Sequence, residues 1–334
     1  MKATIADVEA APTTSSSIVI TDKVKLAGLA LLAVALIAVF MLIQAQGMWE
    51  FVLPRRAVKI LAMVLAGASI AASTVIFQSV TNNRILTPSI IGVDSLYVLI
   101  QTAIVFFLGS MHPIVLSPSL NFLVAVGVMI LFSLIMHRLF FTELKSNIYV
   151  LLLMGIIFGT LFQSLSSFLS VLIDPNEFLV VQRRMFASFN QVKTELLTLS
   201  YAAAAATALY LSRYARFLDV LALGKEHAIN LGVDHHRVVR GLLVSVFILI
   251  SISTALVGPI TFLGLIVANV AYEMLSTYRR LPLIGAAILV SIVALVGGQL
   301  IVERVFSFST TLSVIINFIG GIYFLYLLLK ERSA

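Results

Sequence analysis

Residues 282–302 read PLIGAAILVSIVALVGGQLIV, an apolar stretch that contains no charged side chain. About 20 such residues, wound as a helix, cross roughly 30 Å of lipid hydrocarbon. A helix is required because lipid offers backbone N–H and C=O groups no hydrogen-bond partner, so these groups must pair within the segment. The stretch therefore predicts one membrane-spanning α-helix.

Similar apolar stretches recur along the whole chain of 334 residues. Sixty per cent of the residues are hydrophobic, 11% are charged and the mean hydropathy is +1.10, whereas an ordinary soluble domain is about 45–50% apolar and about 25% charged. We therefore predict an all-α polytopic membrane protein with about ten transmembrane helices. Hydropathy alone also allows nine or eleven, because several stretches are short or poorly separated. The expected spans are residues 25–46, 58–80, 91–109, 119–137, 147–172, 193–212, 236–257, 260–276, 282–302 and 310–329.

Lysine and arginine positions indicate how the chain is oriented. If the N-terminus is cytoplasmic, most of the 22 Lys and Arg residues fall in cytoplasmic segments, as the positive-inside rule requires. Both termini are then expected in the cytoplasm, because an even number of spans returns the chain to the side where it began. This topology accounts for the net charge of +7, so we expect no nucleic-acid partner.

The chain is expected to divide into a short tail and one membrane domain. Residues 1–22 are polar and lack the basic start and short apolar core of a signal peptide, which predicts a flexible cytoplasmic tail. Residues 23–334 are expected to form a transmembrane domain, with nothing left over for a separate soluble domain. The chain has no cysteine, which excludes disulfides and thiolate metal sites.

The longest polar-rich interruption lies between the sixth and seventh spans. Residues 212–240 mix charged and apolar side chains, and Gly224 and Gly232 bracket a stretch from Lys225 to Leu231 that suits a short amphipathic helix. A helix of this kind on the cytoplasmic surface can dock a soluble partner. On these features alone, an ordinary basic loop that obeys the positive-inside rule is an equal alternative.

The sequence contains no motif for catalysis or metal binding. Gly224-Lys225 is followed by Glu226 and lacks the earlier glycine of a phosphate-binding loop. The five histidines lack the H-E-x-x-H spacing of zinc enzymes, so we expect neither enzymatic activity nor a bound metal. The acidic residues near spans all lie close to a predicted span end, which disfavours an ion-coupled secondary transporter. These residues are Asp94, Glu195, Glu273 and Glu303.

The fifth span carries both small and polar residues. Gly155 and Gly159 are four residues apart, a spacing that lets two helices approach closely. Further along, Gln163, Ser166 and Ser167 are expected either to line a polar path through the membrane or to form hydrogen bonds with neighbouring helices.

Four segments of the chain carry a family resemblance. They are LPR at 53–55 with LAGA at 65–68, TNN at 81–83 and PSIIGV at 88–93; LDVLALG at 218–224 with LGV at 231–233; GPITFLGLI at 258–266; and GG at 320–321 before an apolar run to Lys330. In this order, over residues about 50–330, they resemble the permease subunits of type II ABC importers for iron chelates, haem and vitamin B12.

The resemblance implies a permease with ten spans and two cytoplasmic termini, in agreement with the charge pattern. It also implies a second permease subunit, identical or homologous, two ATP-binding cassette subunits and an extracytoplasmic siderophore-binding protein. No cofactor is expected on this chain, because the partner ATPase subunits use ATP and magnesium. The implied location is the bacterial plasma (inner) membrane, as a multi-pass protein.

The resemblance also gives the segment at about 213–235 a role. In the family, the matching segment sits in a cleft of the ATPase and transmits its closure to the membrane helices. A short helix joined to the sixth and seventh spans is a suitable lever, because its movement tilts the helices that gate the pore. The expected coupling residues are Leu218, Asp219, Leu223, Gly224, Lys225, Glu226, His227, Ala228, Leu231 and Gly232.

Three arginines are expected on the outer side. Arg55 matches the arginine that the family presents to acidic residues of the binding protein, Arg304 lies near a second such position, and Arg56 is an adjacent candidate. Exposed charges of this kind mainly set the encounter rate and weaken with salt. Simple anchoring at the outer lipid headgroups is the alternative. The resemblance further implies a structural turn at Gly258 and Pro259.

The cargo is expected to be a ferric siderophore. The chain departs from the family pattern at Ala268-Asn269, where Pro-His is common, and at Asp94, where a small residue is common. These features, together with VERVFSFSTTL at 302–312, look most similar to the branch for catecholate-type siderophores. Vitamin B12 or haem is the alternative cargo, and an ion-coupled secondary transporter is the alternative of another class.

Overall fold

The computed structural model describes residues 15–43, 49–142, 148–190, 192–307 and 310–332. Within these ranges the chain is helical and contains no strand, which confirms the all-α prediction. Residues 1–14 of the expected tail lie outside the described residues, and residues 15–22 belong to the first helix. The elements are α1 (Ser15–Leu42), α2 (Trp49–Thr81), η1 (Pro88–Ile91), α3 (Val93–Leu108), α4 (Pro113–Leu116), α5 (Pro118–Thr142), α6 (Ile148–Leu172), α7 (Pro175–Met185), α8 (Thr194–Ser212), η2 (Ala215–Phe217), α9 (Leu218–Leu221), α10 (Lys225–Asn230), α11 (His235–Val257), α12 (Leu263–Met274), α13 (Arg280–Arg304) and α14 (Leu312–Arg332).

Each predicted span overlaps one helix of this set. Seven helices in the described part of the chain are long and apolar enough to cross a membrane, namely α1, α2, α5, α6, α11, α13 and α14. α3 and α12 are apolar but shorter. The chain is therefore a multi-pass membrane protein, as the hydropathy predicts.

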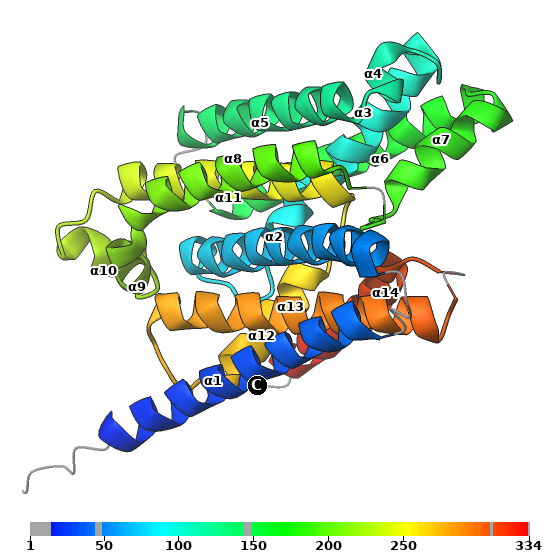
Figure 1. Ribbon diagram of the computed structural model, residues 1–334. Coiled ribbons are helices and arrows are strands. Elements are labelled where there is room, and N and C mark those ends of the chain that lie inside the picture. The colour runs from blue at the N-terminus through cyan, green and yellow to red at the C-terminus, as the bar shows by residue number, and fades with distance from the viewer. Residues whose placement is uncertain (1–14, 44–48, 143–147, 191, 308–309, 333–334) are drawn as a thin grey trace, which may run out of the picture.

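The central helices of the bundle are α2 and α11. In each, 78% of the membrane-length window is buried, against 17–39% in the other five long apolar helices. α2 packs along α11 on one side and along α13 on the other, while α1 covers α13 and α8 covers α11 (Figure 1). Small residues allow this approach, because a methyl group on Gly67 of α2 would lie 2.7 Å from Ser291 Oγ of α13.

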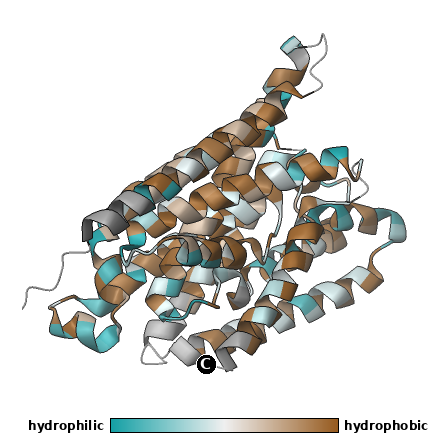
Figure 2. Cartoon of the chain, turned by 90° about the horizontal axis from the view of Figure 1, so that it is seen from below, coloured by the Kyte–Doolittle hydropathy of each residue, from teal (hydrophilic) through white to brown (hydrophobic). Residues whose placement is uncertain are grey.

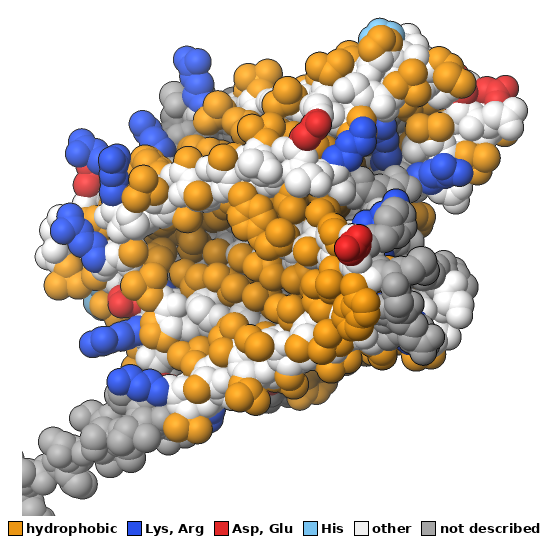
Figure 3. Space-filling view, in the orientation of Figure 1, with side chains coloured by type: hydrophobic (Ala, Val, Ile, Leu, Met, Phe, Trp, Pro, Cys, Tyr) orange, Lys and Arg blue, Asp and Glu red, His pale blue; other side chains and the backbone are white. Residues whose placement is uncertain are grey.

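The two ends of the bundle are polar and the region between them is apolar. Lysine and arginine side chains gather toward the two ends of the visible face, with a broad band of hydrophobic side chains between them (Figure 3). Apolar residues also predominate along the long helices when each residue is coloured by hydropathy (Figure 2). α9 and α10 lie at one end, and α4 and α7 lie at the other (Figure 1).

α7 is an element that the hydropathy pattern does not predict, because residues 173–192 were expected to form an outer connection only. The helix begins with a local signal at Asp174 and Pro175. The Asp174 side chain accepts a hydrogen bond from Asn176 N at 2.9 Å, and proline suits the first helical turn because its missing N–H is not needed there. The sequence thus contained a helix start that a search for apolar spans overlooks.

Two helices begin inside the bundle instead of at its ends. α3 starts after Gly92, whose φ is 87° and whose backbone lies against Gly159 near the midpoint of α6. A methyl group on Gly92 would lie 2.8 Å from both Cα and N of Gly159, which confirms the predicted packing role of Gly159. α12 likewise starts where Phe262 packs against Gly320 within α14.

Asp94 links these two deep helix starts. Its Oδ1 accepts a hydrogen bond from Thr254 Oγ1 at 3.2 Å, and its Oδ2 accepts one from Thr261 Oγ1 at 3.1 Å. Thr254 lies in the last turn of α11 and Thr261 immediately precedes the N-cap of α12. Asp94 is near the end of its span, as predicted, but that end lies beside the middle of α6.

The turn at Gly258 and Pro259 separates α11 from α12. Gly258 has φ 99°, which glycine adopts at little cost, and its N–H donates to Thr254 O at 2.8 Å. A methyl group on Gly258 would lie 2.8 Å from Ala187 Cα, on the segment that follows α7. The close approach of two backbones therefore requires glycine at this position.

Replacing Gly92 with alanine is expected to destabilise the fold by at least about 2 kcal/mol, because the new methyl group meets the Gly159 backbone and the positive φ disfavours a Cβ. The midpoint of thermal unfolding of the detergent-solubilised chain measures this loss. Gly127→Ala is the matched control, since a methyl group there meets nothing within 4 Å. Equal midpoints for the two variants would contradict the proposed close contact.

Candidate functional site

The coupling segment, residues 213–235, contains η2, α9 and α10 and lies at one end of the bundle (Figure 1). The amphipathic stretch that the sequence predicts from Lys225 to Leu231 is confirmed as α10, which ends one residue earlier. Gly224 and Gly232 bracket it with φ values of 99° and 79°. These two conformations favour glycine and set sharp limits to the short helix.

The inner face of the coupling segment is fixed to the membrane helices. Leu218 and Ala228 are buried, at 3% and 0% exposure, and α9 packs against α2. Asp219 Oδ1 accepts a hydrogen bond of 2.6 Å from the backbone N–H of Arg280, the first residue of α13. A carboxylate at a helix N-terminus is stabilised by the free N–H groups there.

The outer face of the coupling segment is exposed and partly apolar. Leu223 and Leu231 are 58% and 63% exposed, and Ile229 is 49% exposed. Isolated exposed apolar side chains need no explanation, but three on one short projecting segment form a small apolar surface that a protein partner can cover. The other coupling residues that are exposed are Asp219, Lys225, Glu226, His227 and Gly232.

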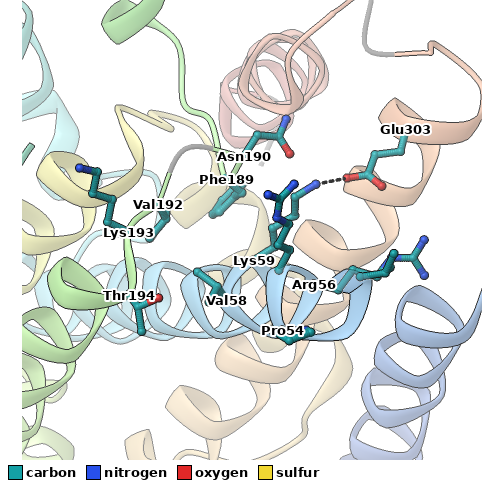
Figure 4. A pocket seen from close by; sticks show the side chains of 12 residues that line it. Pro54, Arg56, Val58, Lys59, Phe189, Asn190, Val192, Lys193, Thr194 and Glu303 are labelled. Atoms are coloured by element: carbon teal, nitrogen blue, oxygen red, sulfur yellow. Dashed lines mark hydrogen bonds and ion pairs between the residues drawn. The ribbon is translucent and has the colours of Figure 1, made fainter. Parts of the chain in front are cut away.

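A basic cavity lies near the other end of the bundle (Figure 4). It has a volume of about 840 Å³ and opens between the first turns of α2, residues 189–190 and 192–194, and the end of α13. Four cationic side chains and one carboxylate line it, so it favours an anionic ligand. These residues are Arg55, Arg56, Lys59, Lys193 and Glu303.

One ion pair crosses the cavity from α2 to α13. Lys59 Nζ lies 3.1 Å from Glu303 Oε1, and the same oxygen accepts a hydrogen bond of 3.0 Å from Gln299 Nε2 (Figure 4). The two charged side chains are only 21% and 11% exposed. Water therefore screens the pair less than it screens a pair on an open surface.

The three predicted docking arginines are used differently. Arg55 is exposed and lines the cavity, and Arg304 is exposed at the end of α13. Arg56 instead donates through Nη1 to the carbonyl oxygens of Phe40, Met41 and Ile43, at 3.0, 2.9 and 2.7 Å. Its guanidinium therefore caps the C-terminal end of α1.

Lys59 and Lys193 are cavity residues that the sequence reading did not select. Lys59 lies one helical turn after Arg55, a spacing that places both on one face of a helix and that was visible in the sequence. Lys193 lies far from Arg55 in the chain and reaches the cavity only because α8 packs beside α2.

The polar residues of α6 divide into two groups. Ser166 is buried and its Oγ lies 2.9 Å from Thr102 Oγ1 of α3, so it joins two helices. Gln163 and Ser167 are exposed on α6, next to exposed apolar residues such as Leu165. The two predicted roles therefore apply to different side chains: Ser166 bonds a neighbouring helix, and only the other two are open to a path.

Arg184 joins α7 to the rest of the bundle. Its Nη1 donates to Gln101 Oε1 at 2.6 Å and its Nη2 donates to Val115 O at 2.7 Å. Gln101 also exchanges two hydrogen bonds with Asn121 of α5. The pKa of Arg184 lies below its ordinary value, because the lowering effect of burial exceeds the raising effect of nearby Tyr97. No local pattern identifies this network, because its members come from four elements.

Known proteins match nearly the whole chain. The model of the FecCD transport family matches residues 21–330. The petrobactin import system permease protein YclO of Bacillus subtilis (strain 168) is 55% identical over 313 residues, which are 94% of this chain and 99% of that protein. The petrobactin import system permease protein FatC of Bacillus anthracis is 38% identical over 282 residues, 84% of this chain and 80% of that protein.

A solved structure shares the fold. It is described as an inward-facing conformation of a transporter assigned to the metal-chelate ABC type, and it superposes with a TM-score of 0.76 at 24% identity. The match covers 92% of this chain and 99% of that chain.

Arg56→Ala is expected to lower the midpoint of thermal unfolding, because three carbonyl groups at the end of α1 lose a charged donor. Hydrogen bonds to charged groups contribute about 1.5–3 kcal/mol each. Arg55→Ala is the control on the neighbouring, more exposed residue and is expected to lower the midpoint less than Arg56→Ala does. A larger loss in Arg55→Ala than in Arg56→Ala would contradict this division of roles.

Proposed function

The chain belongs to the FecCD transport family, and from this premise we propose that it is the permease subunit of an ABC importer that carries a ferric siderophore into the cell. The observation that carries the proposal is the 55% identity to a petrobactin import permease over 94% of this chain and 99% of that protein. A match of this extent includes the coupling segment as well as the membrane helices. Ferric petrobactin is therefore the cargo that we propose, in preference to vitamin B12 or haem.

The proposed topology has ten crossings and two cytoplasmic termini in the bacterial inner membrane. Contacts between distant segments support it. Lys25 Nζ near the start of α1 donates to Met274 O at 2.7 Å, and Asp22 accepts a hydrogen bond from Ser276 N. Asp219 of the coupling segment accepts a hydrogen bond from Arg280 N, which lies four residues after Ser276. The first half of α1 and the coupling segment therefore lie at the same end of the bundle.

The coupling segment is the proposed site of the ATPase partner. Two ATP-binding cassette subunits, one under each of two permease subunits, bind ATP and magnesium and close on each other. The exposed apolar side chains of Leu223 and Leu231 support a protein contact here. The buried side of the segment supports its use as a lever, since α9 packs on α2 and bonds to α13. This chain itself contributes no catalytic group.

The basic cavity is the proposed receptor for acidic side chains of the extracytoplasmic siderophore-binding protein. Arg55 and Arg304 are exposed near it, and Lys59 and Lys193 add further positive charge. Opposite charges of this kind accelerate encounter and set the register of the two proteins. Arg56 contributes mainly its positive charge, because its Nη1 already donates to carbonyl groups at the end of α1.

The polar side chains of Gln163 and Ser167 support a path along α6. Exposed amide and hydroxyl groups on a membrane helix are unfavourable against lipid, so we place this face toward a second permease subunit and the cargo path between the two subunits. Weak polar contacts suit transport, because a deep binding site would slow release.

Uptake of iron-labelled petrobactin into proteoliposomes tests the proposed function. Vesicles that contain the chain, the ATPase subunits and the binding protein are expected to accumulate the label only with ATP. Vesicles without the ATPase are expected to match empty vesicles. Uptake that persists without the ATPase and follows an ion gradient would support a secondary transporter and contradict the proposal.

Leu223→Asp and Leu231→Asp are each expected to weaken association with the ATPase subunit by about tenfold or more, because a charge then enters an apolar contact. The affinity of the detergent-solubilised permease for the ATPase subunit measures the effect. Leu179→Asp is the control, since Leu179 is 52% exposed on α7 at the opposite end. Unchanged affinity in both coupling variants would place the ATPase contact elsewhere.

A further inference from the structure

The connection between α12 and α13, residues 275–279, is held from two directions. On one side, Asp22 of α1 accepts a hydrogen bond from Ser276 N at 3.2 Å. On the other side, Asp219 of the coupling segment accepts the 2.6 Å hydrogen bond from Arg280 N. A displacement of the coupling segment therefore acts directly on the first residue of α13.

The Arg280 side chain extends from this point to α12. Its Nη1 donates to Tyr272 Oη at 2.9 Å, and its Cζ lies 5.5 Å from the centre of the Tyr272 ring. Its Nε is buried and has no hydrogen-bond acceptor among the described residues. One N–H of the guanidinium is thus left unsatisfied among the described residues, which is unusual for a buried polar group.

Tyr272 continues the contact to the α2–α3 connection, residues 82–87. The Arg84 guanidinium Cζ lies 4.8 Å from the centre of the same ring. The Arg84 carbonyl oxygen accepts hydrogen bonds from Gln78 of α2 and Asn269 of α12, at 2.5 and 3.2 Å. Asn269 is one of the positions where the chain departs from the Pro-His of the family pattern.

The α2–α3 connection leads to the deep start of α3. It passes through η1 to Gly92, which is packed against Gly159 of α6. Because that contact leaves no space for a methyl group, a movement of the connection is passed to α3 instead of being absorbed by a void. The coupling segment also approaches this connection directly, with Gly224 near the side chain of Asn82.

The contacts along this route are of kinds that can break and form again. Arg84 and Arg280 share the neutral aromatic ring of Tyr272, and Arg280 alone donates to its hydroxyl group. Within the described residues, no carboxylate forms an ion pair with either arginine. Cation–π contacts and single hydrogen bonds cost far less to break than a buried ion pair. The contacts can therefore rearrange during each transport cycle.

We propose that Tyr272, held between Arg84 and Arg280, is a positioning residue that carries a displacement of the coupling segment to the α2–α3 connection and the start of α3. This role rests on the proposed function, since the displacement comes from the ATPase partner. The route runs from Asp219 through Arg280 and Tyr272 to Arg84.

The test measures iron-labelled petrobactin uptake and ATP hydrolysis in the same proteoliposomes, with the full complex of permease, ATPase and binding protein. Tyr272→Phe removes the hydroxyl and keeps the ring. Asp219→Ala removes the acceptor for Arg280 N, whereas Asp219→Asn keeps an acceptor oxygen. Tyr278→Phe is the matched control, because Tyr278 lies in the same connection and is 95% exposed.

Uptake per ATP hydrolysed is expected to fall roughly fivefold in Tyr272→Phe and Asp219→Ala, the effect of losing one hydrogen bond. Asp219→Asn and Tyr278→Phe are expected to stay near the wild-type ratio. Binding of the ATPase is expected to be unchanged in Tyr272→Phe and Tyr278→Phe, because both residues lie outside the coupling segment. For the two Asp219 variants, ATPase binding is measured separately and uptake is compared per ATP hydrolysed by the assembled complex.

Wild-type ratios in both Tyr272→Phe and Asp219→Ala would overturn the inference, as would an Asp219→Asn variant as impaired as Asp219→Ala. If Asp219→Ala does not assemble, Tyr272→Phe decides alone, since it removes a single oxygen atom. A wild-type complex without ATP-dependent uptake would instead overturn the proposed function, so the two failures are distinguishable.

Discussion

The structure depends on how the chain satisfies backbone groups inside an apolar bundle. A helix that starts within the membrane leaves its first N–H groups without partners in the helix, and lipid cannot supply them. α3 and α12 both start in this way. At the start of α12, Asn317 Oδ1 accepts a hydrogen bond from Phe262 N. At the start of α3, the Asp94 side chain in the first turn holds the helix end in place by accepting hydrogen bonds from Thr254 and Thr261.

The same deep helix starts bear on which helices of the bundle move in the proposed mechanism. Helices that cross the whole bundle, such as α2 and α11, are buried along most of their length and resist displacement. α3 and α12 are shorter, and each is joined to the coupling end by a connection that the Asp219–Arg280–Tyr272–Arg84 contacts hold. At the other end, α3 reaches α7 through Gln101 and Arg184. One route thus links the proposed ATPase surface to the outer helices.

Hydropathy predicts most of the long helices, because lipid imposes a single rule on every span. The amphipathic period from Lys225 to Leu231 is equally local, and α10 forms there. What the sequence does not predict are contacts between distant segments. Arg56 looks like an outer docking residue in the sequence, yet its three acceptors lie at the end of α1. No local sequence pattern marks Tyr272 as a functional residue, since its proposed role comes from contacts with Arg84 and Arg280 on other elements.

In the proposed mechanism, the coupling segment and the α12–α13 connection move together against the membrane helices. The chain has no cysteine, so pairs of spin labels can be placed on introduced cysteines at exposed Arg216, Tyr278 and Leu161. Arg216 lies in η2 of the coupling segment, outside the apolar surface proposed for the ATPase. Distances are measured in the assembled complex without nucleotide and after trapping with ATP and vanadate. We predict a constant distance from position 216 to 278 and a changed distance from 216 to 161 on α6. A changed 216 to 278 distance with a constant 216 to 161 distance would contradict this mechanism.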